Sequence, residues 1–341
     1  MGTEKRERKK ANRAAKLAAE QAAADRKRRL RLLRNGVILV IVLVLLITYT
    51  LAFILLSALP SDGVMARYAS PDLALSAEEL QRIRDTYGAD EPILAQYVQA
   101  LGGFVTGNFG YSVQTGTAVS TLLAEAIPGT VALALLAFAL AVVLALGIAI
   151  VGTSEKFRAV GDVFRSLPAF MVSLPTFWLG IVIIQLVSFR LGWVPVIGAS
   201  PAQALILPTI TLSIPIAAPL AQVLIRSIDQ VKGQPFIQAV RARGAGEVWI
   251  FWRNILRNAM LPALTMAGLL FGELVGGAVV TEAVFGRAGL GQMTVQAVAN
   301  RDTPVLLAVV VIAATLYVLI NLIVDLLYPV LDARLRRKVR S

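Results

Sequence analysis

The sequence contains no cysteine and no histidine. Without cysteine the chain can form no disulfide, no thiolate metal site and no thiol nucleophile. Without histidine it lacks the commonest general base and metal ligand of proteins. These absences exclude most catalytic schemes, so we expect no catalytic residue, no metal site and no cofactor in this chain.

Charged residues are also scarce, at 16% of 341 positions, whereas hydrophobic residues make up 57%. Soluble domains usually carry about 25% charged residues. Each of six long apolar stretches reaches the roughly 20 residues that a helix needs to cross a bilayer. The stretches cover residues 37–59, 127–152, 166–188, 203–225, 259–281 and 304–328. Because backbone groups in lipid must satisfy one another, we predict an all-α polytopic membrane protein with six transmembrane helices.

The basic residues indicate how the chain crosses the membrane. Of 33 lysines and arginines, 27 lie in segments 1–36, 153–165, 226–258 and 331–341. Six spans place these four segments on one side, which the positive-inside rule makes cytoplasmic. We therefore expect a multi-pass protein of the inner (cytoplasmic) membrane, in contact with lipid, with both termini cytoplasmic. The net charge of +12 follows from this topology, and we expect no nucleic-acid partner.

The remaining segments suggest a simple division of the chain. Residues 1–36 form a basic tail, either a solvated tail near anionic lipid or a regulatory arm. Residues 60–126 form an extracytoplasmic cap segment, in which Ser76 and Glu79 fit a capping box and Gly88 ends the helix. Residues 127–330 form the membrane core, and residues 331–341 form a basic C-terminus. Interior prolines are expected to bend the third and fourth spans.

The fifth span contains the candidate residues for a transport path. Gly268, Gly272 and Gly276 recur every four residues, a pattern that allows close helix packing or lines a pore interface. Glu273 lies beside this stripe, and a carboxylate at that depth usually faces a cavity or a partner. A role in attracting a substrate ammonium and a purely structural role both remain open. Glu282 and Asp325 lie nearer the membrane ends and are expected to be structural or interfacial.

The loop between the fourth and fifth spans carries a short polar motif. It contains small residues and ends in glycine, over Gln238, Ala239, Val240, Arg241, Ala242, Arg243 and Gly244. No Gly-x-x-x-x-Gly-Lys-Ser/Thr motif occurs, so the chain has no phosphate loop of its own. If ATP drives its process, another subunit must bind the nucleotide.

From about residue 87 to 338 the chain resembles the first permease subunit of dipeptide/oligopeptide ABC importers. Six ordered runs carry this resemblance. They are GNFGYS at 107–112, LPTFWLG at 174–180, RLGWVP at 190–195, LRNAMLP at 256–262, TEAVF at 281–285 with GLG at 289–291, and NLIVDLLY at 321–328. The resemblance implies the type I ABC importer permease architecture and a coupling helix near 236–245. Gln238, Ala239 and Val240 take the Glu-Ala-Ala positions of the family motif, with Gln in place of Glu, and Gly244 is its glycine.

The resemblance also implies partners and a mechanism. These are a second permease subunit in a heterodimer, two ATP-binding subunits and an extracytoplasmic substrate-binding protein. Nucleotide-driven closure of the ATPases would move the coupling helices and open the path by alternating access. Two other classes remain: a proton-coupled secondary transporter that uses Glu273 or Asp325, and a membrane scaffold or receptor without transport. The sequence does not choose among peptides, nickel chelates, haem precursors and sugars as substrate.

Overall fold

The computed structural model describes residues 35–58, 63–68 and 75–331. Contacts divide the chain into two units, of which the first ends at Leu51 and the second begins at Ala52. The first predicted span corresponds to the apolar helix Asn35–Ser57. Nearly all of the predicted basic tail (1–36) and of the basic C-terminus (331–341) lies outside the described residues.

The second unit is built from helices, and the isolated bridge between Tyr111 and Ala118 is the one β-type pairing in its described part. The helices are α2 (Gly63–Tyr68), α3 (Ala77–Tyr87), α4 (Ile93–Thr106), α5 (Val119–Thr153), η2 (Glu155–Phe157), α6 (Arg158–Ser173), α7 (Thr176–Ile183), η3 (Ile184–Arg190), α8 (Gln203–Lys232), α9 (Pro235–Ala242), α10 (Glu247–Ile250), η4 (Phe251–Leu256), α11 (Arg257–Phe285), α12 (Leu290–Ala299) and α13 (Thr303–Leu331).

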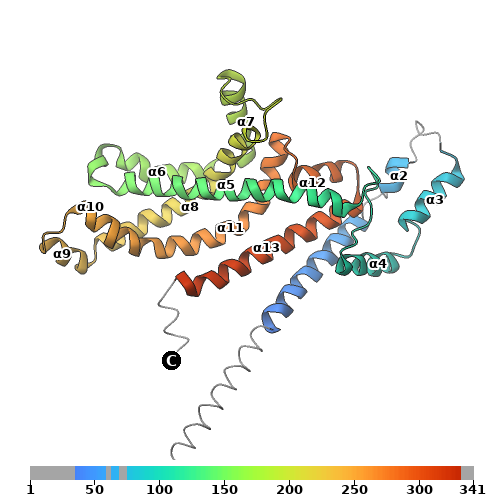
Figure 1. The fold of residues 1–341 in the computed structure, drawn as a ribbon, viewed down its shortest axis with the longest axis horizontal. Coiled ribbons are helices and arrows are strands. Elements are labelled where there is room, and N and C mark those ends of the chain that lie inside the picture. The colour runs from blue at the N-terminus through green and yellow to red at the C-terminus, as the bar shows by residue number, and fades with distance from the viewer. Residues whose placement is uncertain (1–34, 59–62, 69–74, 332–341) are drawn as a thin grey trace, which may run out of the picture. The chain divides into compact units, whose positions relative to one another are not determined.

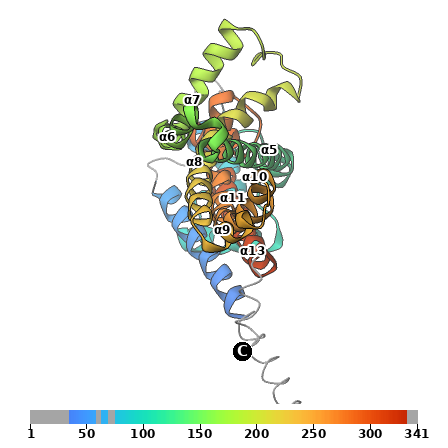
Figure 2. The ribbon, with the colours of Figure 1, turned by 90° about the vertical axis from the view of Figure 1, so that its left-hand side faces the viewer.

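Five described helices are long and apolar enough to cross a membrane, and a sixth span results if one bent pair is counted as a single span. This arrangement confirms the predicted all-helical membrane fold. The difference from the sequence lies in the third span, where 166–188 was expected to form one helix. The chain instead breaks between Ala159–Ser173 and Thr176–Arg190, which meet at 104°, and Figure 1 and Figure 2 show α7 turning away from α6.

Proline explains the position of this break. Leu174 and Pro175 have extended backbone angles, and a residue before proline is pushed out of the helical region by the proline ring. α8 contains Pro208, Pro215 and Pro219 but remains one continuous helix. The predicted bend of the third span is therefore a complete break, whereas the fourth span is not interrupted.

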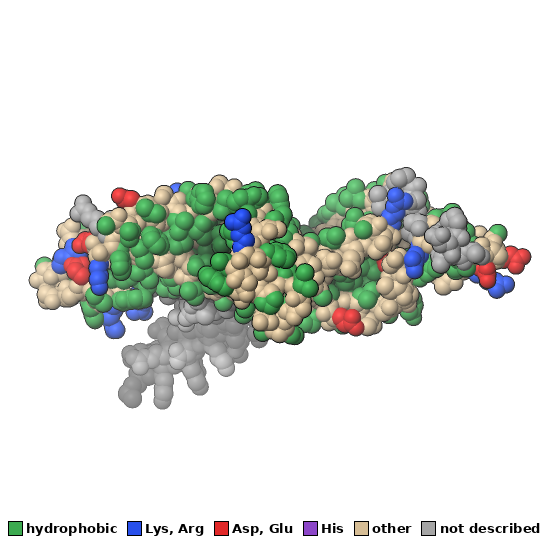
Figure 3. Space-filling model, turned by 90° about the horizontal axis from the view of Figure 1, so that it is seen from above, with side chains coloured by type: hydrophobic (Ala, Val, Ile, Leu, Met, Phe, Trp, Pro, Cys, Tyr) green, Lys and Arg blue, Asp and Glu red, His purple; other side chains and the backbone are tan. Residues whose placement is uncertain are grey.

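The core of the second unit forms where α5 lies along α8 (Figure 1). Small side chains make this approach close: α5 buries Ala137, Ala141 and Ala145 at intervals of four residues, and α8 buries Ala217 and Ala221. Such stripes bring backbones together so that dispersion contacts hold the pair in an apolar solvent. On the face in Figure 3, apolar side chains dominate the middle of the view, and most charged side chains lie toward its left and right.

The segment between the first two long helices folds as the capping box predicted. The Glu79 N–H donates to the Ser76 hydroxyl at 3.2 Å, and the Ser76 N–H donates to the Glu79 carboxylate at 2.8 Å. Gly88 ends α3 with φ of 62°. α4 continues through Gly102 and Gly103 to a left-handed Gly107.

Three hydrogen bonds from this segment reach the carboxylate of Asp302, which directly precedes α13. The Ser112 hydroxyl donates to the Asp302 carboxylate, and the Val113 N–H donates to it at 3.2 Å. Asp302 is 3% exposed, and a carboxylate at a helix N-terminus is favoured by the helix dipole. Tyr87 extends the link, because its hydroxyl donates to the Ser112 carbonyl at 3.2 Å. The loop after α4 is thus tied to the last long helix.

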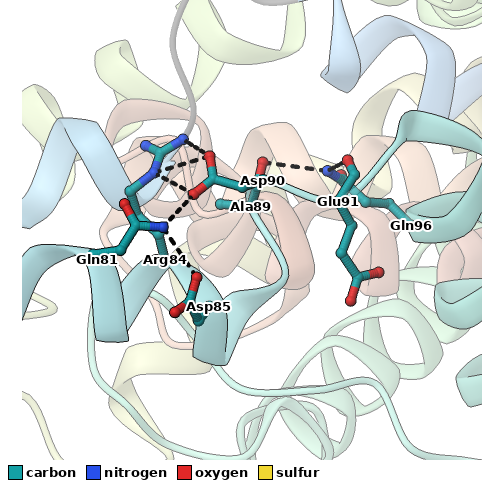
Figure 4. Close-up of polar contacts among 7 residues, drawn as sticks. All are labelled: Gln81, Arg84, Asp85, Ala89, Asp90, Glu91 and Gln96. Atoms are coloured by element: carbon teal, nitrogen blue, oxygen red, sulfur yellow. Dashed lines mark hydrogen bonds and ion pairs between the residues drawn. The ribbon is translucent and has the colours of Figure 1, made fainter.

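A second polar cluster holds the turn between α3 and α4 (Figure 4). The Arg84 Nε donates to both oxygens of Asp90 at 3.1 Å, and the Gln81 amide donates to Asp90 at 2.9 Å. These bonds, first of all that from Arg84, lower the pKa of Asp90 to about 2. Because the carboxylate of Asp90 is exposed to solvent, the pair sets the local geometry of the turn more than it stabilises the fold.

We expect the carboxylate of Asp90 to titrate near pH 2 in the intact chain. An ordinary aspartate has a pKa of about 3.9. The stability that the ionised carboxylate of Asp90 gives to the folded chain is therefore fully present above that pH, and it is lost as the pH falls through the lower pKa of the folded state. Arg84→Gln should move the pKa of Asp90 back toward the ordinary value. Carboxyl-carbon NMR of the labelled chain measures both, and an unchanged pKa in Arg84→Gln would contradict the assignment. Arg82→Gln is the matched control.

Candidate coupling site

The polar loop after α8 starts at a point where α8 is hydrogen-bonded to its neighbouring helices. Arg165 of α6 binds Asp229 of α8 through two bonds of 2.6 and 3.1 Å. One turn later the Lys232 ammonium donates to the Thr153 carbonyl at the end of α5. The ends of α5 and α8 and the middle of α6 are thereby joined where the loop leaves the bundle.

Pro235 favours the start of α9 in this loop because it lies in the first turn of the helix. The N–H groups of a first turn have no acceptor within the helix, so the N–H that proline lacks costs no hydrogen bond. Ile237 is 1% exposed and belongs to the core cluster, and Val240 packs against that cluster. The other face of α9 is open, and it presents Gln238, Ala239, Arg241 and Ala242. The helix is thus anchored by two apolar side chains and offers a small, polar outer face.

Gly244 forms the turn that follows α9. Its N–H donates to the Arg241 carbonyl at 3.0 Å, and its φ is +81°. A Cβ at this position would meet no atom within 4 Å. Glycine is therefore favoured here by the left-handed backbone and not by crowding.

Arg241 is engaged inside the chain. Its Nη2 donates to the Glu247 carboxylate at 2.8 Å across the glycine turn, and the two side chains are 51% and 60% exposed. The sequence analysis did not identify Glu247 as the partner of Arg241. The pattern that could have predicted this ion pair is the presence of opposite charges on the two sides of the Gly244 turn. Arg243 is exposed and makes no ion pair within the described residues.

Two family models match this chain. The binding-protein-dependent transport system inner membrane component matches residues 141–337, which include the whole loop, and the N-terminal family of such membrane components matches residues 29–134. The chain belongs to this family of ABC importer permeases. It is therefore a transport subunit and a multi-pass inner-membrane protein.

Curated relatives of this permease have peptide-related names. The chain is 33% identical to the glutathione transport system permease protein GsiC of Escherichia coli (strain K12), over 86% of this chain and 95% of that protein. It is 35% identical to a probable peptide ABC transporter permease of Sinorhizobium fredii (strain NBRC 101917 / NGR234), over 83% of this chain and 92% of that protein.

Solved structures show the same fold. An inward-facing structure of the MetNI methionine ABC transporter superposes with a TM-score of 0.52 at 21% identity. The match covers 62% of the permease and 96% of the solved chain. This similarity supports the type I importer architecture predicted from the sequence.

The TEAVF and GLG runs of the permease meet in a buried polar cluster. Glu282 is fully buried, accepts a bond of 2.7 Å from the Gly291 N–H, and lies 4.0 Å from the Arg287 guanidinium. Arg287 in turn donates to the Gly129 carbonyl at 2.9 Å. Glu282 therefore has a structural position that joins α5, α11 and α12.

The structure separates the three path candidates on α11. Gly272 is buried, and a Cβ there would press on Asn321 and Tyr317 of α13 at 3.0 and 3.1 Å. Glu273 and Gly276 instead lie exposed, and Gly276 has open space around it. Gly272 serves helix packing within the chain, whereas Glu273 and Gly276 share an uncovered face.

Two further expectations concern charged groups. Asp325 lies in α13, but its side chain is outside the described residues. Among the described residues, no group of three or more Asp and Glu side chains is arranged to hold a metal ion. The charged groups that the structure does bring together are the ion pairs and buried clusters given above.

Proposed function

We propose that this permease is one of two different membrane subunits of an ATP-driven importer for di- or oligopeptides. One of two ATP-binding subunits would dock at α9, and an extracytoplasmic binding protein would deliver the substrate to the opposite side. The observation that carries this proposal is α9: its inner face is fixed in the core, and its outer face is free for a partner.

The expected mechanism follows from the connections of α9. Movement of α9 passes through Ile237 into the helix core and along the chain into α8 and α11. The hydrogen bonds that join α5, α6 and α8 make these three helices move together. Closure of the ATPase pair would thus tilt the bundle and open the path outward, as alternating access requires. The basic residues of the loops support a cytoplasmic position for α9 and both termini.

A peptide substrate is supported by the relatives named above, one for glutathione transport and one for peptides. The chain contributes a charge that fits this class. α11 leaves a continuous stripe of Thr265, Leu269, Glu273, Gly276 and Val280 exposed. A carboxylate facing lipid at this depth costs about 2.5–3.5 kcal/mol, so such groups face a cavity or a partner. This stripe therefore lines the path or the contact with the second permease.

We infer that Glu273 attracts the N-terminal ammonium of the peptide. Glu273→Gln removes the charge and keeps the size, and it should lower uptake of a free dipeptide about tenfold, which corresponds to about 1.4 kcal/mol. Uptake of the N-acetylated peptide should change little. Initial rates in proteoliposomes measure both, with Glu125→Gln, an exposed carboxylate on α5, as the control. Unchanged uptake in a well-inserted Glu273→Gln protein would refute the role.

Reconstitution tests the function itself. The permease, its companion and two ATPase subunits should co-purify, and in proteoliposomes they should take up labelled glutathione, dipeptides or oligopeptides only with ATP and binding protein. A proton-coupled transporter would instead accumulate substrate with a pH gradient alone. Uptake driven by that gradient without ATPase subunits would overturn the proposal.

A further inference from the structure

The segment between α9 and α11 exposes an aromatic surface. Val248 is 74% exposed, Trp249 51% and Trp252 57%. The indole rings stand open although neighbouring Ile250 and Ile255 are buried. Two exposed tryptophans so close together indicate a surface that meets another phase or another molecule.

Two arginines share this surface. Arg253 and Arg257 are exposed, and together with Gly246, Glu247, Val248, Trp249 and Trp252 they line an open hollow of about 880 Å³. Neither guanidinium makes a hydrogen bond or ion pair within the described residues. The one carboxylate of the hollow, that of Glu247, is already bound by Arg241. The hollow therefore has two unneutralised positive charges beside two indoles.

The position of this surface along the chain matches a membrane boundary. The apolar span that continues through α11 begins at Glu247, so the hollow lies at its end. The π-helical turn η4 widens the helix here, and such turns often occur at functional sites. Tryptophan favours the headgroup level of a bilayer, and arginine there attracts anionic lipid.

We propose that this hollow binds the headgroup of an anionic phospholipid. The phosphate would lie between Arg253 and Arg257, and the rings of Trp249 and Trp252 would lie at the boundary between headgroup and acyl chain. The charge complementarity selects this occupant, since both exposed cations lack an acid of this chain and the indoles continue the apolar span. Glu247 connects the hollow to α9 through Arg241. On the proposed function, a bound lipid would therefore fix the height of the coupling helix at the membrane surface.

Fluorescence quenching tests this binding directly. The permease complex is prepared with Trp178→Phe and Trp193→Phe, which leaves Trp249 and Trp252 as its permease tryptophans. It is placed in nanodiscs that contain either brominated phosphatidylglycerol or brominated phosphatidylcholine at equal content. The other subunits also contain fluorescent tryptophans. Their signal is removed by subtracting the fluorescence of a complex that also carries Trp249→Phe and Trp252→Phe. We expect at least twofold stronger quenching by the anionic lipid. Equal quenching by the two lipids would overturn the proposal.

Charge variants identify the ligand groups. The double variant Arg253→Gln and Arg257→Gln should abolish the preference for the anionic lipid and lower its occupancy in native mass spectrometry about tenfold. Arg243→Gln, an exposed arginine outside the hollow, should change neither. Millimolar inorganic phosphate should not displace the lipid, and displacement would show a free-anion site instead. If binding of the ATPase subunits abolishes quenching of both indoles by either lipid, the hollow is a protein interface. That result would also overturn the proposed lipid site.

These measurements are independent of transport. If the lipid preference holds but labelled peptides are not taken up, the proposed substrate class fails and the lipid site stands. If peptide uptake is normal and the quenching shows no preference, the lipid site fails alone.

Discussion

Arg241→Glu is expected to uncouple ATP hydrolysis from transport. The change breaks the ion pair with Glu247 and places two carboxylates on either side of the Gly244 turn. An exposed pair of this kind contributes only about 0.2–1 kcal/mol to stability, so membrane insertion should be preserved. The outer face of α9 should nevertheless be displaced, and uptake per ATP hydrolysed should fall about tenfold or more. Parallel ATPase and uptake assays in proteoliposomes measure this ratio.

The charge swap identifies the reason for the loss. Arg241→Glu combined with Glu247→Arg restores the pair with reversed polarity and should recover most of the coupled uptake. Arg243→Glu, which breaks no ion pair within the described residues, is the matched control for charge. If the double variant remains as inactive as Arg241→Glu, then Arg241 acts on a partner subunit and not through Glu247.

The turn at Gly244 offers a second variant with a different physical basis. Valine is a severe outlier at the positive φ of this residue, whereas asparagine tolerates it. Gly244→Val should therefore distort α9 and reduce coupling, and Gly244→Asn should remain close to the original. Equal losses in both would show that the side chain, and not the backbone, disturbs the site.

Gly289→Ala is expected to destabilise the fold strongly. The added methyl group would collide with the buried carboxylate of Glu282, which must then leave the Gly291 N–H. Overpacking and a broken buried hydrogen bond together cost about 3 kcal/mol. The thermal unfolding midpoint of the purified chain should fall by about 5 °C or more, with a smaller yield of inserted protein.

The matched control uses a glycine with free space. Gly276 lies in α11, and a Cβ there would meet nothing within 4 Å. Gly276→Ala should leave the melting temperature unchanged or raise it slightly, because alanine favours helix more than glycine does. An equal loss of stability in both variants would show that the buried cluster is not the cause.

The two sets of variants separate two kinds of sites in this permease. The Glu282 cluster joins α5, α11 and α12 from within, so its loss should reduce the amount of folded protein. The outer face of α9 contributes little to packing, so its variants should fold and fail only in the assembled transporter. A permease variant that is abundant but inactive therefore points to the loop, and one that is scarce points to the core.

The helices were largely predictable because their signals are local. Long runs without charge determine spans, and Ser76, Glu79 and Gly88 determine the ends of α3 within a few residues of chain. The motif at 238–244 was also a local signal, since α9 and the glycine turn form at the residues where the motif occurs. The third span could not be read in this way, because a proline can either continue a bent helix, as in α8, or end it, as at Pro175.

Contacts between distant residues could not be predicted from local patterns. The glycine stripe suggested one smooth surface, yet Gly272 packs on α13 while Gly276 is open, because the partner helices approach only part of the face. The pairing of Arg165 with Asp229, and of Asp302 with the loop at Ser112, joins residues 64 and 190 positions apart. Such pairs depend on which helices lie together in space.

The sequence by itself determined the membrane class, the helical fold and the family, and it predicts that positive charge gathers on one side of the membrane. These properties follow from hydropathy, length and charge, which each segment carries alone. Only the tertiary structure decided that Glu282 is buried, that Arg241 is held by Glu247, and that Trp249, Trp252, Arg253 and Arg257 share one hollow. Burial and neighbours arise from the packing of several helices, so no single segment contains them.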